Sequence, residues 1–159
     1  MLIKGIIDED FVNYKKPCMV IEFPFCTFKC DKECGKQVCQ NSTLAQLENT
    51  DIKPIYITAR YVFNEITQAI VAQGLEPVDS WEDLLRLISE FRKQTNDDFV
   101  IYTGYTKEEL QSMGYIDVLK KFSNIIIKFG RYIPNQKSHY DEILGINLAS
   151  DNQYAEKIS

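Results

Sequence analysis

Short apolar runs alternate along this chain with stretches whose apolar residues recur at helical spacing. The runs have the length of buried strands, and they end at Gly, Pro or a polar cluster. Strand then helix, repeated about four times, predicts parallel strands joined by crossover helices. The predicted strands lie at 3–7, 18–23, 68–72, 99–103, 124–128 and 146–148, and the predicted helices at 41–48, 57–66, 80–91, 106–113 and 116–122.

Two of the predicted helices carry capping signals at their start. Asn41, Ser42 and Thr43 have short polar side chains that accept hydrogen bonds from the free N–H groups of a first turn. Ser80 and Asp83 fit a capping box in which Asp takes the place of Glu. We therefore expect one helix to begin near Asn41 and another near Ser80.

The near-continuous apolar character of the strands is typical of a sheet that is covered on both faces. We predict a single α/β domain over residues 1–159 with a mostly parallel sheet. Ligands of such sheets bind outside the carboxyl ends of the strands. Three segments follow strands directly and are expected to meet at that edge: residues 24–41, Gly74–Pro77 and Gly104–Tyr105.

Composition narrows the class of protein. Hydrophobic residues make up 45% and charged residues 26% of the 159 residues, which is the balance of a globular domain. No apolar run reaches the ~18 residues of a membrane span, and the acidic Asp8 argues against a secretory signal. The net charge of −5 argues against a general nucleic-acid-binding surface. We expect a cytoplasmic protein whose partners are neither membranes nor nucleic acids.

Five cysteines crowd the first quarter of the chain. Cys18 lies in an apolar run and is expected to be a buried small hydrophobe. Cys26, Cys30, Cys34 and Cys39 lie in the polar segment 24–41, which has no apolar period and is predicted to be a loop. Clustered thiols in odd number, without a signal peptide, favour metal ligation over a disulfide framework.

The cysteine spacing favours an iron–sulfur cluster over zinc. Structural zinc sites usually combine two close cysteine pairs that are far apart in sequence. Here a single group of cysteines is followed by no second pair, and the lone histidine, His139, is expected to be a surface residue. Four such thiols can hold either zinc or a cluster, so a zinc site stays open as the alternative.

Several blocks of the chain, taken in order, resemble radical S-adenosylmethionine (SAM) enzymes. More narrowly, the chain resembles the activating proteins of anaerobic ribonucleoside-triphosphate reductase. The blocks are similar to that family's cluster loop, its Gly-Gly-Glu-Pro turn, its Tyr-Thr-Gly-Tyr-x-x-Glu-Glu-Leu block and its Asp-Gly-Arg and Asn-Gln stretches. In this chain they are Phe23–Cys30 with Cys39–Thr43, Gly74–Pro77, Ile101–Leu110, Lys128–Arg131 and Asn152–Gln153.

The cysteine spacing departs from the family's Cys-x3-Cys-x2-Cys. Cys26 and Cys30 keep the first interval, but Cys34 comes one residue late. Cys39 comes six residues late, although Gln-Asn-Ser-Thr follows it as the resemblance requires. The aromatic residue that precedes the third cysteine in the family is also missing. Both Cys34 and Cys39 therefore remain candidates for the third ligand.

The resemblance implies a partial, open TIM-like barrel that binds a 4Fe-4S cluster and SAM. It implies reductive cleavage of SAM to a 5′-deoxyadenosyl radical, which generates a glycyl radical on an anaerobic ribonucleotide reductase or a related glycyl radical enzyme. The electron donor would be a flavodoxin-like protein. The implied metal ligands are Cys26, Cys30 and Cys34 or Cys39, and the implied cofactor-binding residues are Gly74, Leu75, Glu76, Pro77, Tyr102, Thr103, Gly104, Lys128 and Arg131.

Other functions and other local structures are also compatible with these sequence features. The altered cysteine loop is compatible with a degenerate, non-catalytic or zinc-binding module that acts through protein interaction. SAM cleavage directed at a different acceptor, such as a peptide, is a third hypothesis. Locally, Gly74–Pro77 is also typical of an ordinary strand-ending turn, and Asn152 and Gln153 of a loose chain end.

Overall fold

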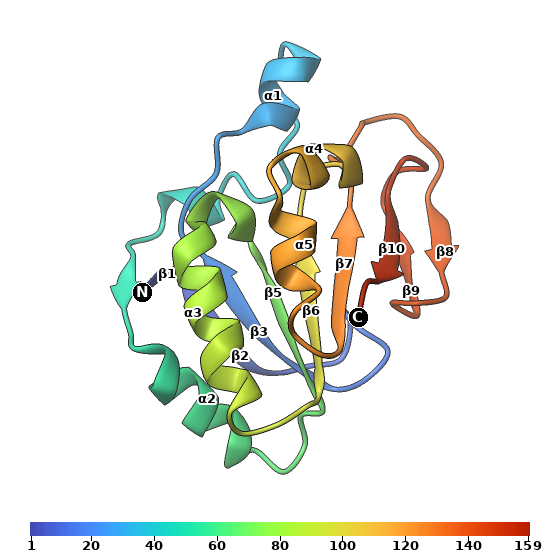
Figure 1. Cartoon of the computed structure of the whole chain (residues 1–159). Helices are drawn as coiled ribbons and strands as arrows, with labels where there is room; N and C mark the ends of the chain where they lie inside the picture. Colours follow the sequence, from blue (N-terminus) through green and yellow to red (C-terminus); the bar gives the residue numbers. More distant parts are fainter.

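In the computed structural model, which describes residues 1–159, a six-stranded sheet forms the centre of the molecule, in the order β10-β7-β6-β5-β3-β2 (Figure 1). The edge strands β2 (Gly5–Asp10) and β10 (Tyr154–Lys157) run antiparallel to their neighbours. The sheet is therefore mixed but mostly parallel, and the architecture is α/β. The four central strands, β3 (Cys18–Phe23), β5 (Ala69–Gly74), β6 (Asp98–Tyr102) and β7 (Ile125–Phe129), are mutually parallel.

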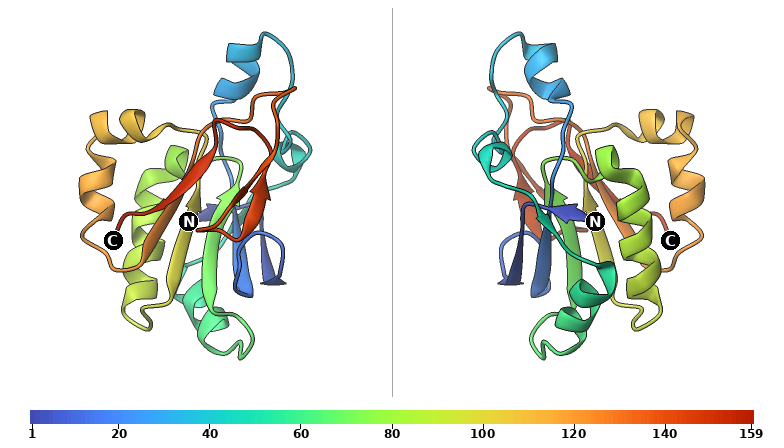
Figure 2. Two further views of the ribbon diagram at one scale, coloured as in Figure 1. Left: turned by 90° about the vertical axis from the view of Figure 1, so that its right-hand side faces the viewer. Right: turned by 90° about the vertical axis from the view of Figure 1, so that its left-hand side faces the viewer.

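The helices cover one face of this sheet (Figure 2). Alternate residues of each strand point to opposite faces, so Met19, Ile21 and Phe23 contribute to the core beneath the helices. Helix α3 buries Leu84, Leu87, Ile88 and Phe91 there because these residues share one helical face. The helices are α2 (Pro54–Val62), α3 (Trp81–Arg92), α4 (Lys107–Ser112) and α5 (Tyr115–Leu119).

A hairpin covers part of the other face. It consists of β8 (His139–Asp141) and β9 (Ile146–Leu148), and Leu144 and Leu148 pack in a second core with Cys18 and Val20. Asp141 fixes the hairpin, because its carboxylate accepts hydrogen bonds from the N–H groups of Leu144 and Ala155, both at 2.9 Å. Ala155 lies in β10, so the hairpin is tied to the edge of the central sheet.

The remaining elements are short. Strands β1 (Leu2–Ile3) and β4 (Thr50–Asp51) pair in a separate two-stranded sheet. Helix α1 (Lys29–Cys34) and the 3-10 turn η1 (Leu44–Gln46) lie in the segment after β3, and the 3-10 turn η2 (Pro77–Ser80) precedes α3. Every helix of the chain is too short or too polar to cross a membrane.

The structure confirms the helix start near Ser80, since α3 begins at Trp81, but it corrects the helix start expected near Asn41. The helix expected at 41–48 is only the turn η1, because the Asn41 side chain donates instead to the Gly74 carbonyl, at 2.6 Å. Ser80 makes no capping hydrogen bond, and its hydroxyl is buried without a partner. The predicted loop at 24–41 contains the helix α1. Local sequence favoured side-chain caps at Asn41 and Ser80, but Asn41 makes a tertiary contact instead and Ser80 caps its helix without a side-chain hydrogen bond.

The other strand and helix predictions agree with the structure to within a few residues. Cys18 is fully buried, as expected. The predicted helix at 57–66 begins earlier, at Pro54, whose fixed φ suits a first helical turn. The chain end is not loose: Gln153 is buried and the strand β10 follows it. Whether the sheet is part of a TIM-like barrel stays a prediction.

Candidate functional site

A cavity of about 360 Å³ lies at the carboxyl ends of the central parallel strands. The segments that follow β3, β5, β6 and β7 all contribute to its walls, which is the edge where ligands of parallel sheets bind. Pro77 and Cys34 are the predicted site residues that do not line it. The predicted residues that do are Cys26, Cys30, Cys39, Gly74, Leu75, Glu76, Tyr102, Thr103, Gly104, Lys128 and Arg131.

Three thiols face this cavity from one loop. Burial is the main cause that raises the pKa of Cys26 to about 12 and the pKa of Cys30 to about 11, and the nearby Cys39 thiol contributes to both shifts. Cys34, at the end of α1, stands apart from the cavity. The thiols are not gathered tightly, since no three His, Cys, Asp or Glu side chains form a group that could hold an ion as they stand. The loop thus brings three soft ligands to one cavity without a preformed metal cage.

Gly74 lets strand β5 end against β3. Its φ of +98° lies in the region that favours glycine. A Cβ atom at this position would meet the Glu22 Cα at 2.8 Å and the Phe23 nitrogen at 2.9 Å. The position therefore requires glycine, and the close approach keeps the Gly74 backbone at the wall of the cavity.

Glu76 is a buried carboxylate with a full set of partners. One oxygen accepts from the Thr103 hydroxyl at 2.8 Å and from Val78 N–H at 3.1 Å, and the other accepts from Gly104 N–H at 2.8 Å. Burial raises the pKa of Glu76 to about 7, although these hydrogen bonds favour the charged form. Glu76 therefore joins the end of β5 to the end of β6.

Lys128 brings a cation to the cavity wall. Its side chain is 8% exposed, and burial lowers its pKa to about 8. The only hydrogen bond of its ammonium group is donated to the Gly130 carbonyl, at 2.7 Å. An ammonium group has three donors, so Lys128 has capacity left for an anionic or carbonyl group of a ligand.

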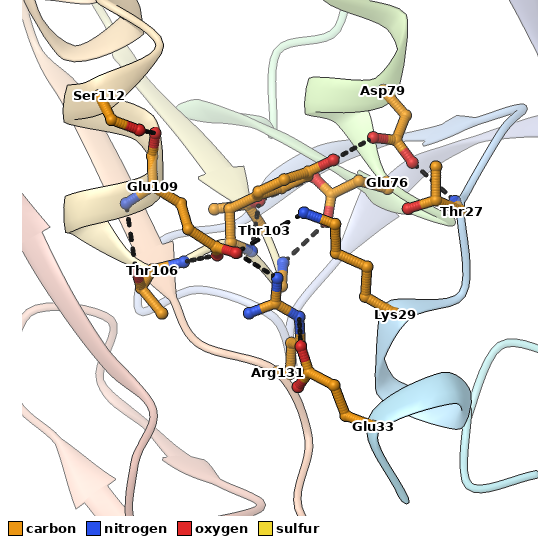
Figure 3. Close-up of polar contacts among 12 residues, drawn as sticks. Thr27, Lys29, Glu33, Glu76, Asp79, Thr103, Thr106, Glu109, Ser112 and Arg131 are labelled. Carbon is orange, nitrogen blue, oxygen red and sulfur yellow. Dashed lines mark hydrogen bonds and ion pairs between the residues drawn. The ribbon is translucent and has the colours of Figure 1, made fainter. Parts of the chain in front are cut away.

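A polar network holds the start of the cysteine loop against the sheet (Figure 3). Asp79 accepts from Thr27 N–H at 2.7 Å and from the Tyr105 hydroxyl at 2.6 Å. The ammonium group of Lys29 lies 4.2 Å from the centre of the Tyr105 ring. The segments that follow β5 and β6 thus hold the loop just after Cys26.

Arg131 fixes the next part of the loop. It pairs with Glu109 of α4 at 2.7 Å and with Glu33 of α1 at 3.4 Å. Lys29 approaches the same Glu109 carboxylate, at 3.6 Å. Because the Arg131 side chain is largely buried while Glu33 is exposed, the pair with Glu109 is the stronger anchor.

Sequence reasoning missed several polar residues of the cavity. Asn13 enters from the β2–β3 connection and Asn147 from the hairpin, and no local pattern marks either. Gln153 lines the cavity as well: its amide oxygen accepts from Ala149 and Ser150, and its nitrogen donates to Gly130 at 3.2 Å. The resemblance did single out Asn152–Gln153, and that was the only available signal.

A scan against protein families matches residues 18–153 of the chain to the 4Fe-4S single cluster domain. The chain belongs to this family and is an iron–sulfur protein. The searches of curated proteins and of solved structures gave no match. The residues present suit such a cluster, because 4Fe-4S clusters are held by cysteine thiolates and three thiols line one cavity.

Proposed function

We propose that this protein is a radical SAM activating enzyme that generates a glycyl radical on an anaerobic ribonucleotide reductase or a related enzyme. The observation that carries the proposal is that three cysteines of an iron–sulfur domain share one cavity with the Gly74 turn and Lys128. When bound, a 4Fe-4S cluster would supply one electron for the reductive cleavage of SAM to methionine and a 5′-deoxyadenosyl radical. The protein residues bind, orient and shield these groups.

Within this proposal, the cluster ligands are Cys26, Cys30 and Cys39. Cys39 is favoured over Cys34 because it lines the cavity and its thiol lies near that of Cys30, whereas Cys34 lies outside the cavity wall. A set of three protein thiolates leaves one iron open to chelate SAM, whereas a fourth thiolate would occupy it. Cys34 is thus a non-ligand in this assignment.

The amino-acid part of SAM is proposed to lie along the β5 and β7 ends. The backbone of Gly74 and Leu75, which lines the cavity, would contact the amino group, and the spare donors of Lys128 suit the carboxylate. Tyr102, Thr103 and Gly104 would border the remainder of the cofactor, with Glu76 holding this wall in place. Arg131 would act mainly by holding the loop.

The proposed partners are the glycyl radical enzyme and a flavodoxin-like electron donor, in the cytoplasm. An open partial barrel would leave the radical accessible to a backbone glycine of a large protein. The arrangement of helices on one sheet face supports this proposal. The alternative is a zinc-binding or non-catalytic module, and it is favoured by one observation, the absence of a preformed three-ligand group.

Anaerobic reconstitution with iron and sulfide tests the proposal, followed by dithionite and SAM and an assay for 5′-deoxyadenosine. We expect about four irons per chain and formation of 5′-deoxyadenosine. Cys26→Ala, Cys30→Ala and Cys39→Ala should each lose both properties.

Cys34→Ala is the matched control and should retain cluster and turnover. Zinc in place of iron, or a full cluster that never cleaves SAM, would overturn the enzymatic function. Loss of the cluster in Cys34→Ala with retention in Cys39→Ala would reverse the ligand assignment.

A further inference from the structure

We infer that Asp31 is a positioning residue that folds the cysteine loop back on itself and so presents Cys39 beside Cys30. The inference rests on the proposed cluster function and deepens it. One carboxylate oxygen of Asp31 accepts two consecutive backbone N–H groups, from Val38 at 2.7 Å and from Cys39 at 2.8 Å. The same oxygen lies 3.8 Å from the Cys30 sulfur. One Asp31 oxygen therefore contacts both ends of the segment that separates Cys30 from Cys39 in the sequence.

The long interval between Cys30 and Cys39 makes such a contact necessary. After Cys30, helix α1 carries the chain away from the cavity and ends at Cys34, and the φ of +65° at its C-cap Gly35 reverses the chain. A Cβ atom on Gly35 would meet nothing within 4 Å, so the glycine serves the turn and not a close packing. The turn reverses the chain direction, but it does not by itself fix the position of Cys39.

No other backbone hydrogen bond holds the returning segment. Between Lys36 and Gln40, the two N–H groups bound to Asp31 are the only backbone groups that hydrogen-bond to the protein. Lys36, Gln37 and Gln40 are exposed, so core packing does not fix the segment either. The next anchor is Asn41, whose side chain donates to the Gly74 carbonyl at 2.6 Å. The position of Cys39 thus depends on Asp31 before it and on Asn41 after it.

The oxygen of Asp31, more than its charge, is what this role requires. Asn offers a carbonyl oxygen in the same position and can accept both hydrogen bonds, whereas Ala offers none. Asp31→Asn and Asp31→Ala therefore form a matched pair. Lys32→Ala is a suitable control on the neighbouring position, since the exposed Lys32 side chain makes no hydrogen bond or ion pair.

The first test uses the metal-free chain and does not depend on cluster function. In a Cys34→Ala background, diamide is added and the Cys30–Cys39 disulfide is quantified over time by peptide mass spectrometry. We expect Asp31→Ala to slow its formation about tenfold, because the effective concentration of one thiol near the other falls. Asp31→Asn and Lys32→Ala should stay within about twofold of the parent. Equal rates in Asp31→Ala and the parent, or an Asp31→Asn as slow as Asp31→Ala, would overturn the inference.

The second test measures iron per chain after anaerobic reconstitution of the same variants. Asp31→Ala should bind less iron than the parent, and Asp31→Asn should recover it. Thermal unfolding of the metal-free variants should be unchanged, because the loop lies outside both hydrophobic cores. A parent chain that binds no iron would contradict the proposed function while the disulfide rates still decide the role of Asp31. Full iron loading in Asp31→Ala would count against the inference alone.

Discussion

Glu76 shows at the residue scale how one side chain serves both the fold and the site. Its two oxygens accept hydrogen bonds from Val78, Thr103 and Gly104, so the ends of β5 and β6 are held at fixed separation. The charged groups that face it are Asp79 and Lys128. Burial outweighs the favourable hydrogen bonds and raises its pKa from 4.5 to about 7. The folded state therefore holds a proton in a pH range where the unfolded chain has lost it.

This shift gives the stability of the metal-free protein a defined pH dependence. The contribution of Glu76 is fully present below about pH 4.5 and is lost as the pH rises through about 7. The free energy of unfolding from urea titrations should therefore fall across this window in the wild type relative to Glu76→Gln. At higher pH the wild-type carboxylate still accepts hydrogen bonds at both oxygens, whereas Gln has one acceptor oxygen and cannot accept from both Thr103 and Gly104. A difference between the two proteins that does not vary with pH would contradict this assignment.

At the scale of elements, α4 is a short helix that depends on its cap. Thr106 and Glu109 form a reciprocal capping box, in which the Thr106 hydroxyl accepts from Glu109 N–H at 3.2 Å and the Glu109 carboxylate accepts from Thr106 N–H at 2.8 Å. So short a helix is not stable by itself. The cap also orients Glu109 toward Arg131. The helix start thus helps to hold the arginine that anchors α1.

Thr106→Ala should lower the free energy of unfolding by about 1 kcal/mol, the usual loss for an N-cap. Thr106→Ser keeps the hydroxyl and is expected to stay close to wild type. Urea denaturation of the three proteins provides the measurement. Hydrogen exchange should also show faster exchange in α1 for Thr106→Ala, because the first turn of α4, which carries Glu109, loses the hydrogen bond from Glu109 N–H to the hydroxyl. Unchanged exchange in α1 would show that the cap of α4 does not stabilise α1.

At the scale of the whole molecule, the two faces of the sheet are covered very differently. The helical face carries a core of 22 buried residues, and the opposite face a core of 10. The smaller core depends on the hairpin β8–β9 and on the fully buried Leu144. The hairpin also supplies Ile146, Asn147 and Leu148 to the cavity wall. The same element therefore closes the second core and completes the site.

Leu144→Ala should cost about 2–5 kcal/mol of unfolding free energy, the range for a buried leucine that leaves a cavity. Leu47→Ala is the control, because Leu47 is 56% exposed and its truncation should change stability by less than about 0.5 kcal/mol. Equal effects in the two variants, measured by urea denaturation, would show that the hairpin does not cover a core.

The sequence by itself determined the four central strands, their parallel direction and the edge where the site lies. Apolar runs such as those at 18–23 and 124–128 are local signals, and a parallel α/β arrangement places their carboxyl ends together. The cysteine cluster and the block at Gly74–Pro77 likewise pointed to the walls of the cavity. These inferences succeeded because they depend on local periodicity and on residue chemistry.

Only the tertiary structure decided which residues close the site. It brings Cys39 to the cavity and leaves Cys34 outside, uses Asn41 to bind Gly74 instead of capping a helix, and buries Gln153 where a loose tail was expected. Each outcome depends on a hydrogen bond between residues whose proximity no local pattern reveals. Asn41 and Gly74 are 33 positions apart, and Gln153 and Gly130 are 23 apart. Backbone and side-chain polar groups that become buried must find partners, and the folded chain alone determines which partners are within reach.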